Sequence, residues 1–307
     1  MKSDGKPIPV RTSPPAGSIW KFRRAKALPR GGKTLIMGIV NLTPDSFSGG
    51  GGGLPSPARA VDAALEMLEN GADLIDFGAE SSRPGAVALA AGEEIRRLGE
   101  TVRMLGSQST APISVDTYHA ETAARVLDQG ADMINDITAL RGGWDPGRDS
   151  DPAMAGLLAR EKAAAVLMHM PAPSLSMQAA AGYENVFSEV RDFLLRRADF
   201  ALEAGIAPEN IWLDPGFGFG KNFSHNRELL LRLNELASPG FPLLAGLSRK
   251  RMIADALGLA PGRRLEASLA LALLAAWNGA RAVRVHDVPE TARALGMLDA
   301  VRSGLRV

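Results

Sequence analysis

Residues 34–41 read TLIMGIVN, an apolar run that ends on the polar side chain of Asn41. Such a run is typical of a strand buried on both faces, as strands of parallel sheets are. Similar runs occupy residues 72–80, 112–117, 132–138, 164–170, 211–216, 242–248 and 282–287. Longer amphipathic patterns separate them. This alternation predicts a single (β/α)8 TIM barrel at residues 31–307, preceded by an N-terminal extension at residues 1–30.

The helical segments carry their own start and stop signals. Before the pattern at residues 57–70, Ser56 is a suitable cap, Pro57 suits the first turn, and Gly71 ends it. A denser apolar pattern at residues 263–279 predicts a helix packed on the sheet. A doubly wound open sheet is the alternative fold, but the chain lacks the glycine signature of dinucleotide-binding sheets.

Composition narrows the classes of function. The 307 residues are 46% hydrophobic and 5% aromatic, carry a net charge of +1 and include no cysteine. A nearly neutral, aromatic-poor chain does not indicate nucleic-acid binding, and no apolar run has the length of a membrane span. A chain without cysteine has no thiolate nucleophile and fits a reducing cytoplasm. The basic, proline-containing residues 1–30 predict a flexible or strand-like extension, with an organelle transit peptide as the alternative.

Polar side chains close each predicted strand. In a (β/α)8 barrel these ends converge on one face, where binding and catalytic residues lie. The alternative for any one of them is a helix cap or a satisfied turn. The set comprises Asn41, Glu80, Ser81, Ser82, Asp116, Asn135, Asp136, His169, Asp214, Ser248, His286 and Asp287.

Three of these ends suit a flat heterocycle. Asp116, Asn135 and Asp214 offer acceptors, and a buried carboxylate needs donors from a neighbour or a ligand. A planar ring with an amino-amidine edge would supply paired donors. Lys250 could complement an oxo group of the same ring. With Arg249 and Arg251 it places three cations at a predicted helix start, which invites an anionic partner; a solvated helix start is the alternative.

The last predicted strand indicates a phosphate or diphosphate site. Arg284 and His286 are two residues apart, so they face the same side of the strand. Pro289 and Glu290 then begin a helix whose amides favour an anion. Phosphate sites in barrels commonly form after the seventh and eighth strands. The alternative is that Arg284 pairs with a neighbouring barrel carboxylate.

The segment DPGFGFGK at residues 214–221 is neither of the familiar nucleotide loops. Its glycines alternate with other residues, at Gly216, Gly218 and Gly220, and the spacing fits neither a dinucleotide fingerprint nor a P-loop. Such alternation lets the backbone approach a flat ligand closely. The ring of Phe217 or Phe219 could then pack against that ligand. Signatures of zinc proteases, EF-hands and α/β-hydrolases are also missing.

Taken in order, the motifs IMGIVNLTPDSFSGGG, GADLIDFGAESSRPGA, ISVDT, INDI, VLMHM, LDPGFGFGK, GLSRK and RVHDV resemble those of the dihydropteroate synthase family. The resemblance runs from residue 34 to residue 307. It implies a cytoplasmic, homodimeric (β/α)8 barrel that uses Mg²⁺ and is a sulfonamide target. The implied reaction joins 4-aminobenzoate to (7,8-dihydropterin-6-yl)methyl diphosphate, giving 7,8-dihydropteroate and diphosphate in folate biosynthesis.

The same resemblance implies roles for individual residues. Asp116, Lys250, Arg284 and His286 would be the catalytic group. The pterin would be held by Asp116, Asn135, Met168, Asp214 and Lys250, and the diphosphate by Asn41, Arg83, Arg284 and His286. The aminobenzoate would be flanked by Ser82, Pro84, Phe219 and Ser248, with Arg251 as a weaker candidate for its carboxylate. Asn41 is also the implied metal ligand.

The stretch GIVNLTPDSFSGGGGG at residues 38–53 raises a separate question, because ordering five glycines costs conformational entropy. We interpret residues 43–48 as a lid that closes over the diphosphate, with the glycines as its hinge.

Two alternatives to the synthase stay open on the sequence. One is a pterin-dependent methyltransferase, which would lack the NLTPDSFS and SSRPG pair and need no diphosphate site. The other is an inactive relative that binds pterin or a partner enzyme, which would lose Asn41, Arg83, Lys250 or Arg284; all four are present.

Overall fold

A computed structural model describes residues 19–22, 27–29, 32–43, 55–80, 89–143, 149–173, 182–237 and 240–304. Within these ranges the sheet consists of eight parallel strands in the order β8-β7-β6-β5-β4-β3-β10-β9. They are β3 (Leu35–Asn41), β4 (Leu74–Gly78), β5 (Ile113–Asp116), β6 (Met133–Asp136), β7 (Ala164–Met168), β8 (Ile211–Asp214), β9 (Leu244–Ala245) and β10 (Ala282–Val285). A parallel bridge between Leu213 and Leu243 joins the two ends of this order, so the sheet forms a nearly closed barrel.

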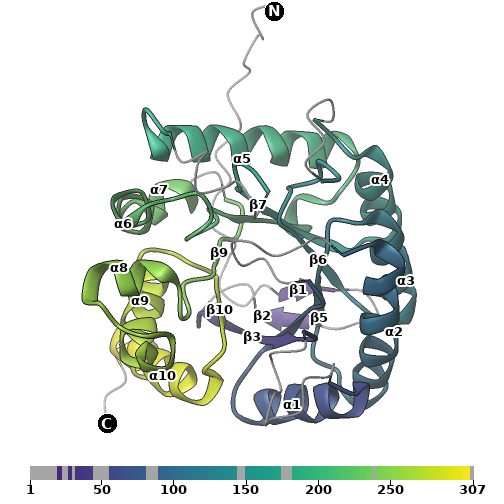
Figure 1. Cartoon of the computed structure of the whole chain (residues 1–307), viewed down its shortest axis with the longest axis horizontal. Helices are drawn as coiled ribbons and strands as arrows, with labels where there is room; N and C mark the ends of the chain where they lie inside the picture. The colour runs from purple at the N-terminus through teal and green to yellow at the C-terminus, as the bar shows by residue number, and fades with distance from the viewer. Residues whose placement is uncertain are drawn as a thin grey trace, which may run out of the picture.

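Helices surround the strands, as Figure 1 shows in a view almost along the barrel axis. They are α1 (Pro57–Glu69), α2 (Ala91–Gln108), α3 (Ala120–Gln129), α4 (Pro152–Glu161), α5 (Val186–Glu203), α6 (Phe223–Leu231), α7 (Leu233–Ala237), α8 (Arg251–Leu257), α9 (Leu265–Trp277) and α10 (Val288–Ser303). The predicted TIM barrel is confirmed, and all eight predicted strands are present. Each is shorter than predicted: β3 loses one residue at its start and still ends at Asn41, whereas the other seven end before the predicted last residue, where the chain enters the following loop.

The predicted start of the first barrel helix is also correct. Ser56 Oγ accepts a hydrogen bond from Arg59 N at 3.3 Å, and Pro57 is the first helical residue. The helix ends at Asn70 and Gly71, where Gly71 has φ +105°. Among the described residues, no helix is both long and apolar enough to cross a membrane.

Two apolar layers hold the barrel together. Alternate residues of each strand point in opposite directions, so in β3 Leu35 and Met37 line the interior while Ile36 and Val40 pack against the helices. The interior layer is filled by side chains such as Met133 and Trp212. This packing closes the barrel interior and leaves the strand ends to form the site.

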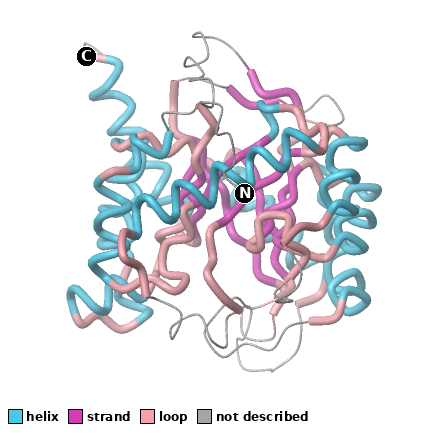
Figure 2. Tube along the Cα trace, turned by 90° about the horizontal axis from the view of Figure 1, so that it is seen from above, coloured by secondary structure: helices cyan, strands magenta, loops and turns pink. Residues whose placement is uncertain are grey.

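A short antiparallel pair, β1 (Ile19–Lys21) and β2 (Ala27–Pro29), lies at one end of the barrel (Figure 2). Phe22 and Leu28 next to it are buried and join the interior layer beside Leu35, Leu244 and Ala282, the first residues of their strands. The pair therefore covers the N-terminal mouth of the barrel. The division into an extension at residues 1–30 and a barrel at residues 31–307 stays a prediction.

Candidate active site

A buried ion pair crosses the C-terminal side of the barrel. Arg284 on β10 donates from Nε to Asp76 Oδ2 on β4 at 2.6 Å, and from Nη2 to Asp116 Oδ2 on β5 at 3.4 Å. Asn135 on β6 donates to the same Asp76 oxygen at 3.3 Å. The Asp76 side chain is fully buried, while those of Arg284 and Asp116 are 20% and 18% exposed. The alternative interpretation of Arg284, pairing with barrel carboxylates, is therefore what the structure shows.

Asp76 is a site residue that sequence reasoning missed. The available signal was a carboxylate in the middle of the apolar run at residues 72–80, where an unpaired charge would cost several kcal/mol, about 3–5. Its Oδ1 atom and Asn135 Oδ1 are buried and have no hydrogen-bond partner within the described part of the chain. Two acceptors are thus left over at the centre of the site.

The charges at this face shift one another's ionisation. Burial raises the pKa of Asp116, opposed by Arg284 and reinforced by Asp76. Burial likewise raises the pKa of Asp214, opposed by the Gly216 N–H. Burial, with Arg284 nearby, lowers the pKa of Lys250 to about 8. These shifts reflect a site in which charges are partly removed from water.

An apolar wall adjoins the charged groups. Met168, at the end of β7, packs with Tyr118, Ile137 and Met170, and Phe219 packs against this cluster. The ammonium of Lys250 lies 3.8 Å from the centre of the Phe219 ring. A flat ring could therefore contact apolar and cationic groups together.

Only one of the two phenylalanines in the glycine-rich segment reaches the site. Phe217 is buried in the layer between sheet and helices, whereas Phe219 belongs to the wall beside Met168. Asp214, which begins the segment, accepts a hydrogen bond from Gly216 N at 2.7 Å. Of the two phenylalanines predicted as a possible aromatic wall, Phe219 therefore lies at the site and Phe217 does not.

Ser248 and His286 form a second polar pair. Ser248 Oγ accepts from His286 N at 3.3 Å and lies 3.0 Å from His286 Nδ1. The hydroxyl can donate its hydrogen to Nδ1, and in that tautomer Nε2 is the protonated ring nitrogen. Burial, together with Arg284, lowers the pKa of His286 to about 4, so the ring is neutral at pH 7.

The three cations at the start of α8 have different neighbours. Arg249 pairs with Asp287, and the exposed Arg251 pairs with Asp255 at 3.4 Å. Protein carboxylates therefore pair with two of the three cations, and an anionic partner shared by all three stays a prediction. Lys250 alone turns into the site.

Other predicted strand-end residues have structural roles. Asp136 accepts from the backbone N–H groups of Thr138 and Leu140, at 2.7 and 2.8 Å, and so stabilises a turn. His169 lies beside Lys221, 3.0 Å from its Nζ atom. Ser82, Arg83, Pro84 and most of the predicted lid fall in residues 44–54 and 81–88, outside the described residues.

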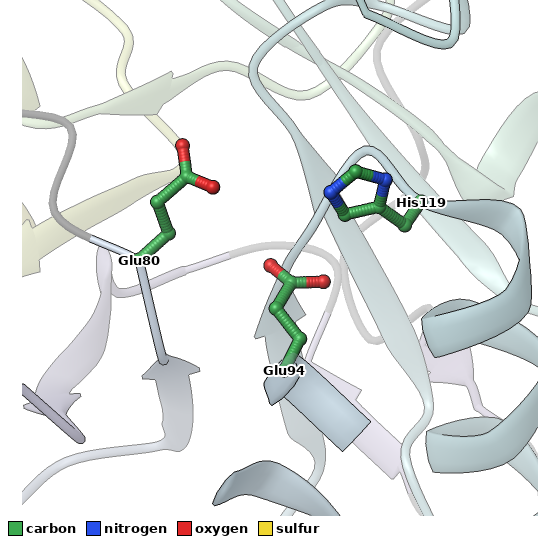
Figure 3. A group of neighbouring side chains, drawn as sticks. All are labelled: Glu80, Glu94 and His119. Atoms are coloured by element: carbon green, nitrogen blue, oxygen red, sulfur yellow. The ribbon is translucent and has the colours of Figure 1, made fainter. Parts of the chain in front are cut away.

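A third cluster lies next to the site (Figure 3). Glu80 after β4, Glu94 on α2 and His119 before α3 each offer one ligand atom, and these atoms lie within 4.8 Å of one another. Each side chain also has a protein partner: Leu89 N donates to Glu80 at 2.8 Å, Thr117 Oγ1 donates to Glu94 at 2.7 Å, and His119 Nε2 lies 3.0 Å from Leu89 O. The cluster could hold a metal ion. The hydrogen bonds to Leu89 and Thr117 are, however, enough to explain why these three side chains lie together.

Comparisons with known proteins agree with this geometry. The model of the pterin binding enzyme family matches residues 37–286. Dihydropteroate synthase of Escherichia coli is 43% identical over 268 residues, covering 87% of this chain and 92% of that protein.

Solved structures give the same result. Xanthomonas albilineans dihydropteroate synthase with 4-aminobenzoic acid superposes with a TM-score of 0.81 at 42% identity, covering 91% of this chain and 96% of that one. The Yersinia pestis enzyme in a sulfonamide drug complex gives 0.85 at 37% identity, covering 93% and 100%. The chain therefore belongs to the dihydropteroate synthase family of pterin-binding enzymes.

Proposed function

We propose that this chain condenses (7,8-dihydropterin-6-yl)methyl diphosphate with 4-aminobenzoate, giving 7,8-dihydropteroate and diphosphate in folate biosynthesis. One observation carries the proposal: buried hydrogen-bond acceptors and one lysine lie together beside an apolar wall. Asp116 and Asp214 end two strands of the barrel, Asn135 is the penultimate residue of a third, and Lys250 lies against Phe219. The reaction would make the enzyme a transferase of a pterinylmethyl group.

The pterin seat we propose consists of Asp116, Asn135, Met168, Asp214 and Lys250. A pterin edge carries N–H donors, and the unpartnered Asn135 Oδ1 is a buried acceptor that such a donor would satisfy. Met168 belongs to the apolar cluster on which the ring would lie. The Lys250 ammonium would complement the oxo group of the ring.

For the diphosphate we propose Asn41, Arg83, Arg284 and His286. Arg284 is already balanced by Asp76 and Asp116, so on its own it brings little net positive charge to the site. A neutral His286 would donate from Nε2, and its orientation is held by Ser248. Arg83 and a further cation would together neutralise the strongly charged diphosphate.

Mg²⁺ is the cation that we propose. Hard oxygen ligands suit this ion, and a side chain added at Gly78 would meet such oxygens: its Cβ would lie 3.4 Å from Asn41 Oδ1 and 3.9 Å from Asp116 Oδ2. The residues present therefore fit, with Asn41 as the ligand. Bound there with the diphosphate, Mg²⁺ would neutralise charge on the departing group.

The aminobenzoate site we propose is formed by Ser82, Pro84, Phe219 and Ser248. Phe219 gives the aromatic ring an apolar face. Ser248 is already engaged with His286, so it would link the aminobenzoate and diphosphate subsites. Arg251 is paired within its own exposed helix, which weighs against a direct role.

In the proposed reaction the bond between the pterin CH2 and the diphosphate oxygen breaks, and the oxygen keeps the electron pair. The amine nitrogen of aminobenzoate bonds to the same carbon and then releases a proton. Arg284 and His286 would stabilise the departing diphosphate, and Asp116 the positive charge that the pterin shares. The aromatic amine is itself nucleophilic, so the chain's residues mainly bind and orient.

The active enzyme we propose is a cytoplasmic homodimer. Within the described residues, the exposed large apolar side chains all lie on α6, α8, α9 and α10, at the left of Figure 1. They are Phe223, Leu231, Leu257, Leu274, Trp277, Met297 and Val301. An apolar face of this kind marks an interaction surface, and a second copy of the chain is the partner that the family resemblance implies.

One assay tests the proposal. The protein is incubated with Mg²⁺, the pterin diphosphate and 4-aminobenzoate, and dihydropteroate is measured by chromatography. We expect product from the wild-type protein and a loss of orders of magnitude in turnover for Arg284→Ala. Folded protein that binds the pterin but yields no dihydropteroate would support the inactive relative instead. Methyl transfer from a folate donor would support the methyltransferase.

A further inference from the structure

Lys221, the last residue of the segment DPGFGFGK, is enclosed by uncharged acceptors. Its side chain is 4% exposed, although lysine is rarely buried without a partner. Nζ lies 3.0 Å from Gly216 O, 3.0 Å from Phe219 O and 3.2 Å from His169 O. It also lies 3.0 Å from His169 Nδ1. The three hydrogens of the ammonium are thus shared among three backbone carbonyls and one ring nitrogen.

The alternating glycines create this enclosure. Gly216, Gly218 and Gly220 have φ of +68°, +82° and +58°, which lets the chain turn back on itself around the ammonium. A Cβ on Gly216 would lie 2.0 Å from His169 O, so the loop backbone also approaches the end of β7 closely. The glycine-rich segment therefore wraps around a cation supplied by the chain itself.

The loop carries two groups that face the substrates. Asp214 accepts from Gly216 N at 2.7 Å, and Phe219 contacts both the Met168 cluster and the Lys250 ammonium. From the other side, Gly218 N donates to Asn226 Oδ1 at 2.8 Å, which ties the loop to α6. Lys221 contacts Phe219 through its backbone carbonyl and so fastens the segment that contributes to both proposed subsites.

We propose that Lys221 is a positioning residue: its ammonium joins the carbonyls of Gly216 and Phe219 to His169, which directly follows β7, and so fixes the Phe219 ring against the aminobenzoate. A lysine suits this task because its compact charge and three rotatable donors match converging carbonyls, as a bound cation would. The inference rests on the proposed function, because that function assigns Phe219 to the aminobenzoate site.

A double-mutant cycle tests the inference. The KM for 4-aminobenzoate is measured for Lys221→Met, for Phe219→Ala and for the variant with both changes. Lys162→Met, which removes an exposed lysine from the end of α4, is the control. We expect each single change at the loop to raise KM about tenfold, the double variant to be no worse than the worse single variant, and the control to match the wild type.

Hydrogen exchange of the peptide covering residues 214–222 gives a readout that does not depend on activity. We expect Lys221→Met to speed exchange at residues 216–220 and to leave β8 and α6 protected. If Lys221→Met is too unstable to purify, Lys221→Gln, which retains N–H donors, takes its place in both measurements.

The outcomes separate the inference from the proposed function. A wild-type protein that makes no dihydropteroate contradicts the function, while faster exchange in the loop would still support the fastening role. Additive effects of Lys221→Met and Phe219→Ala on KM would overturn the inference, as would unchanged exchange in the loop.

Discussion

At the scale of the residue, Lys250 makes the site sensitive to pH. Burial and Arg284 lower its pKa to about 8, so the ammonium is charged below that pH and loses its proton above it. We expect kcat/KM for the pterin diphosphate to fall as pH rises, with a midpoint near 8, because that parameter reports on the free enzyme. Steady-state rates between pH 6 and pH 10 check this.

The matched variant for this prediction is Lys250→Arg, which keeps a charge that does not titrate in that range. Its activity will be lower, because a guanidinium does not fit the Phe219 contact in the same way. The alkaline fall should nevertheless disappear. A fall that persists in Lys250→Arg would assign the titration to another group.

Asp76 is expected to contribute to stability as well as to the site. Asp76→Asn removes one partner of a buried ion pair, and we expect the free energy of unfolding to drop by about 3 kcal/mol, since Asp116 still compensates part of the Arg284 charge. Urea denaturation measures this. Glu100→Gln, which breaks an exposed pair with Arg103, should leave the denaturation midpoint unchanged. Equal midpoints for Asp76→Asn and the wild type would contradict the role of the pair.

Sequence reasoning located the strand-end residues but not their partners. Asp116, Asn135 and Asp214 stand where an apolar strand stops, which is a local signal. The contact of Lys221 with His169 joins positions 52 residues apart and depends on how β7 and β8 pair, so no local pattern could reveal it. For the same reason the sequence leaves both an anion and a barrel carboxylate open as the partner of Arg284, and does not identify Asp76 and Asp116.

At the scale of the element, the loop after β8 is expected to tolerate no side chain at Gly216. Gly216→Ala would place a Cβ 2.0 Å from His169 O, and its φ of +68° is itself unfavourable for alanine. Gly258 is the matched control, because it has the same φ of +68° and nothing within 4 Å of its Cβ position. Both variants pay the backbone cost of about 1–2 kcal/mol.

The difference between these two variants isolates the steric contact. We expect Gly216→Ala to lose at least about 2 kcal/mol more than Gly258→Ala in urea denaturation, since overpacking a tight site adds that much. Similar losses in both variants would show that the loop can move away from β7. That result would also weaken the fastening role of Lys221.

The elements themselves were largely predictable. Parallel strands are buried on both faces, so each appears as a continuous apolar run between helical patterns. The positions of β1 and β2 were not predictable, because three-residue strands that cover a barrel mouth give no periodic signal. Their anchoring side chains, Phe22 and Leu28, are recognisable only once the interior layer is known.

At the scale of the whole molecule, the apolar side formed by α9 and α10 is expected to mediate dimerisation. Trp277 is 59% exposed and Met297 is 65% exposed, on neighbouring helices. Trp277→Glu should convert the dimer to a monomer, because it places a charge in an apolar interface. Analytical ultracentrifugation measures the mass.

The control is Ala124→Glu, which adds the same charge on α3, on the opposite side of the ring of helices in Figure 1. This variant should remain dimeric. A wild-type monomer would contradict the proposal.

We propose above that the C-terminal face of the barrel binds the pterin diphosphate through the residues at its strand ends. A crystal structure of the complex tests it most directly. We expect a pterin ring against Met168, with its N–H edge on Asn135 and Asp214 and its diphosphate at Arg284 and His286. A ligand bound elsewhere, or a ring that leaves Asn135 and Asp214 without contact, would contradict it.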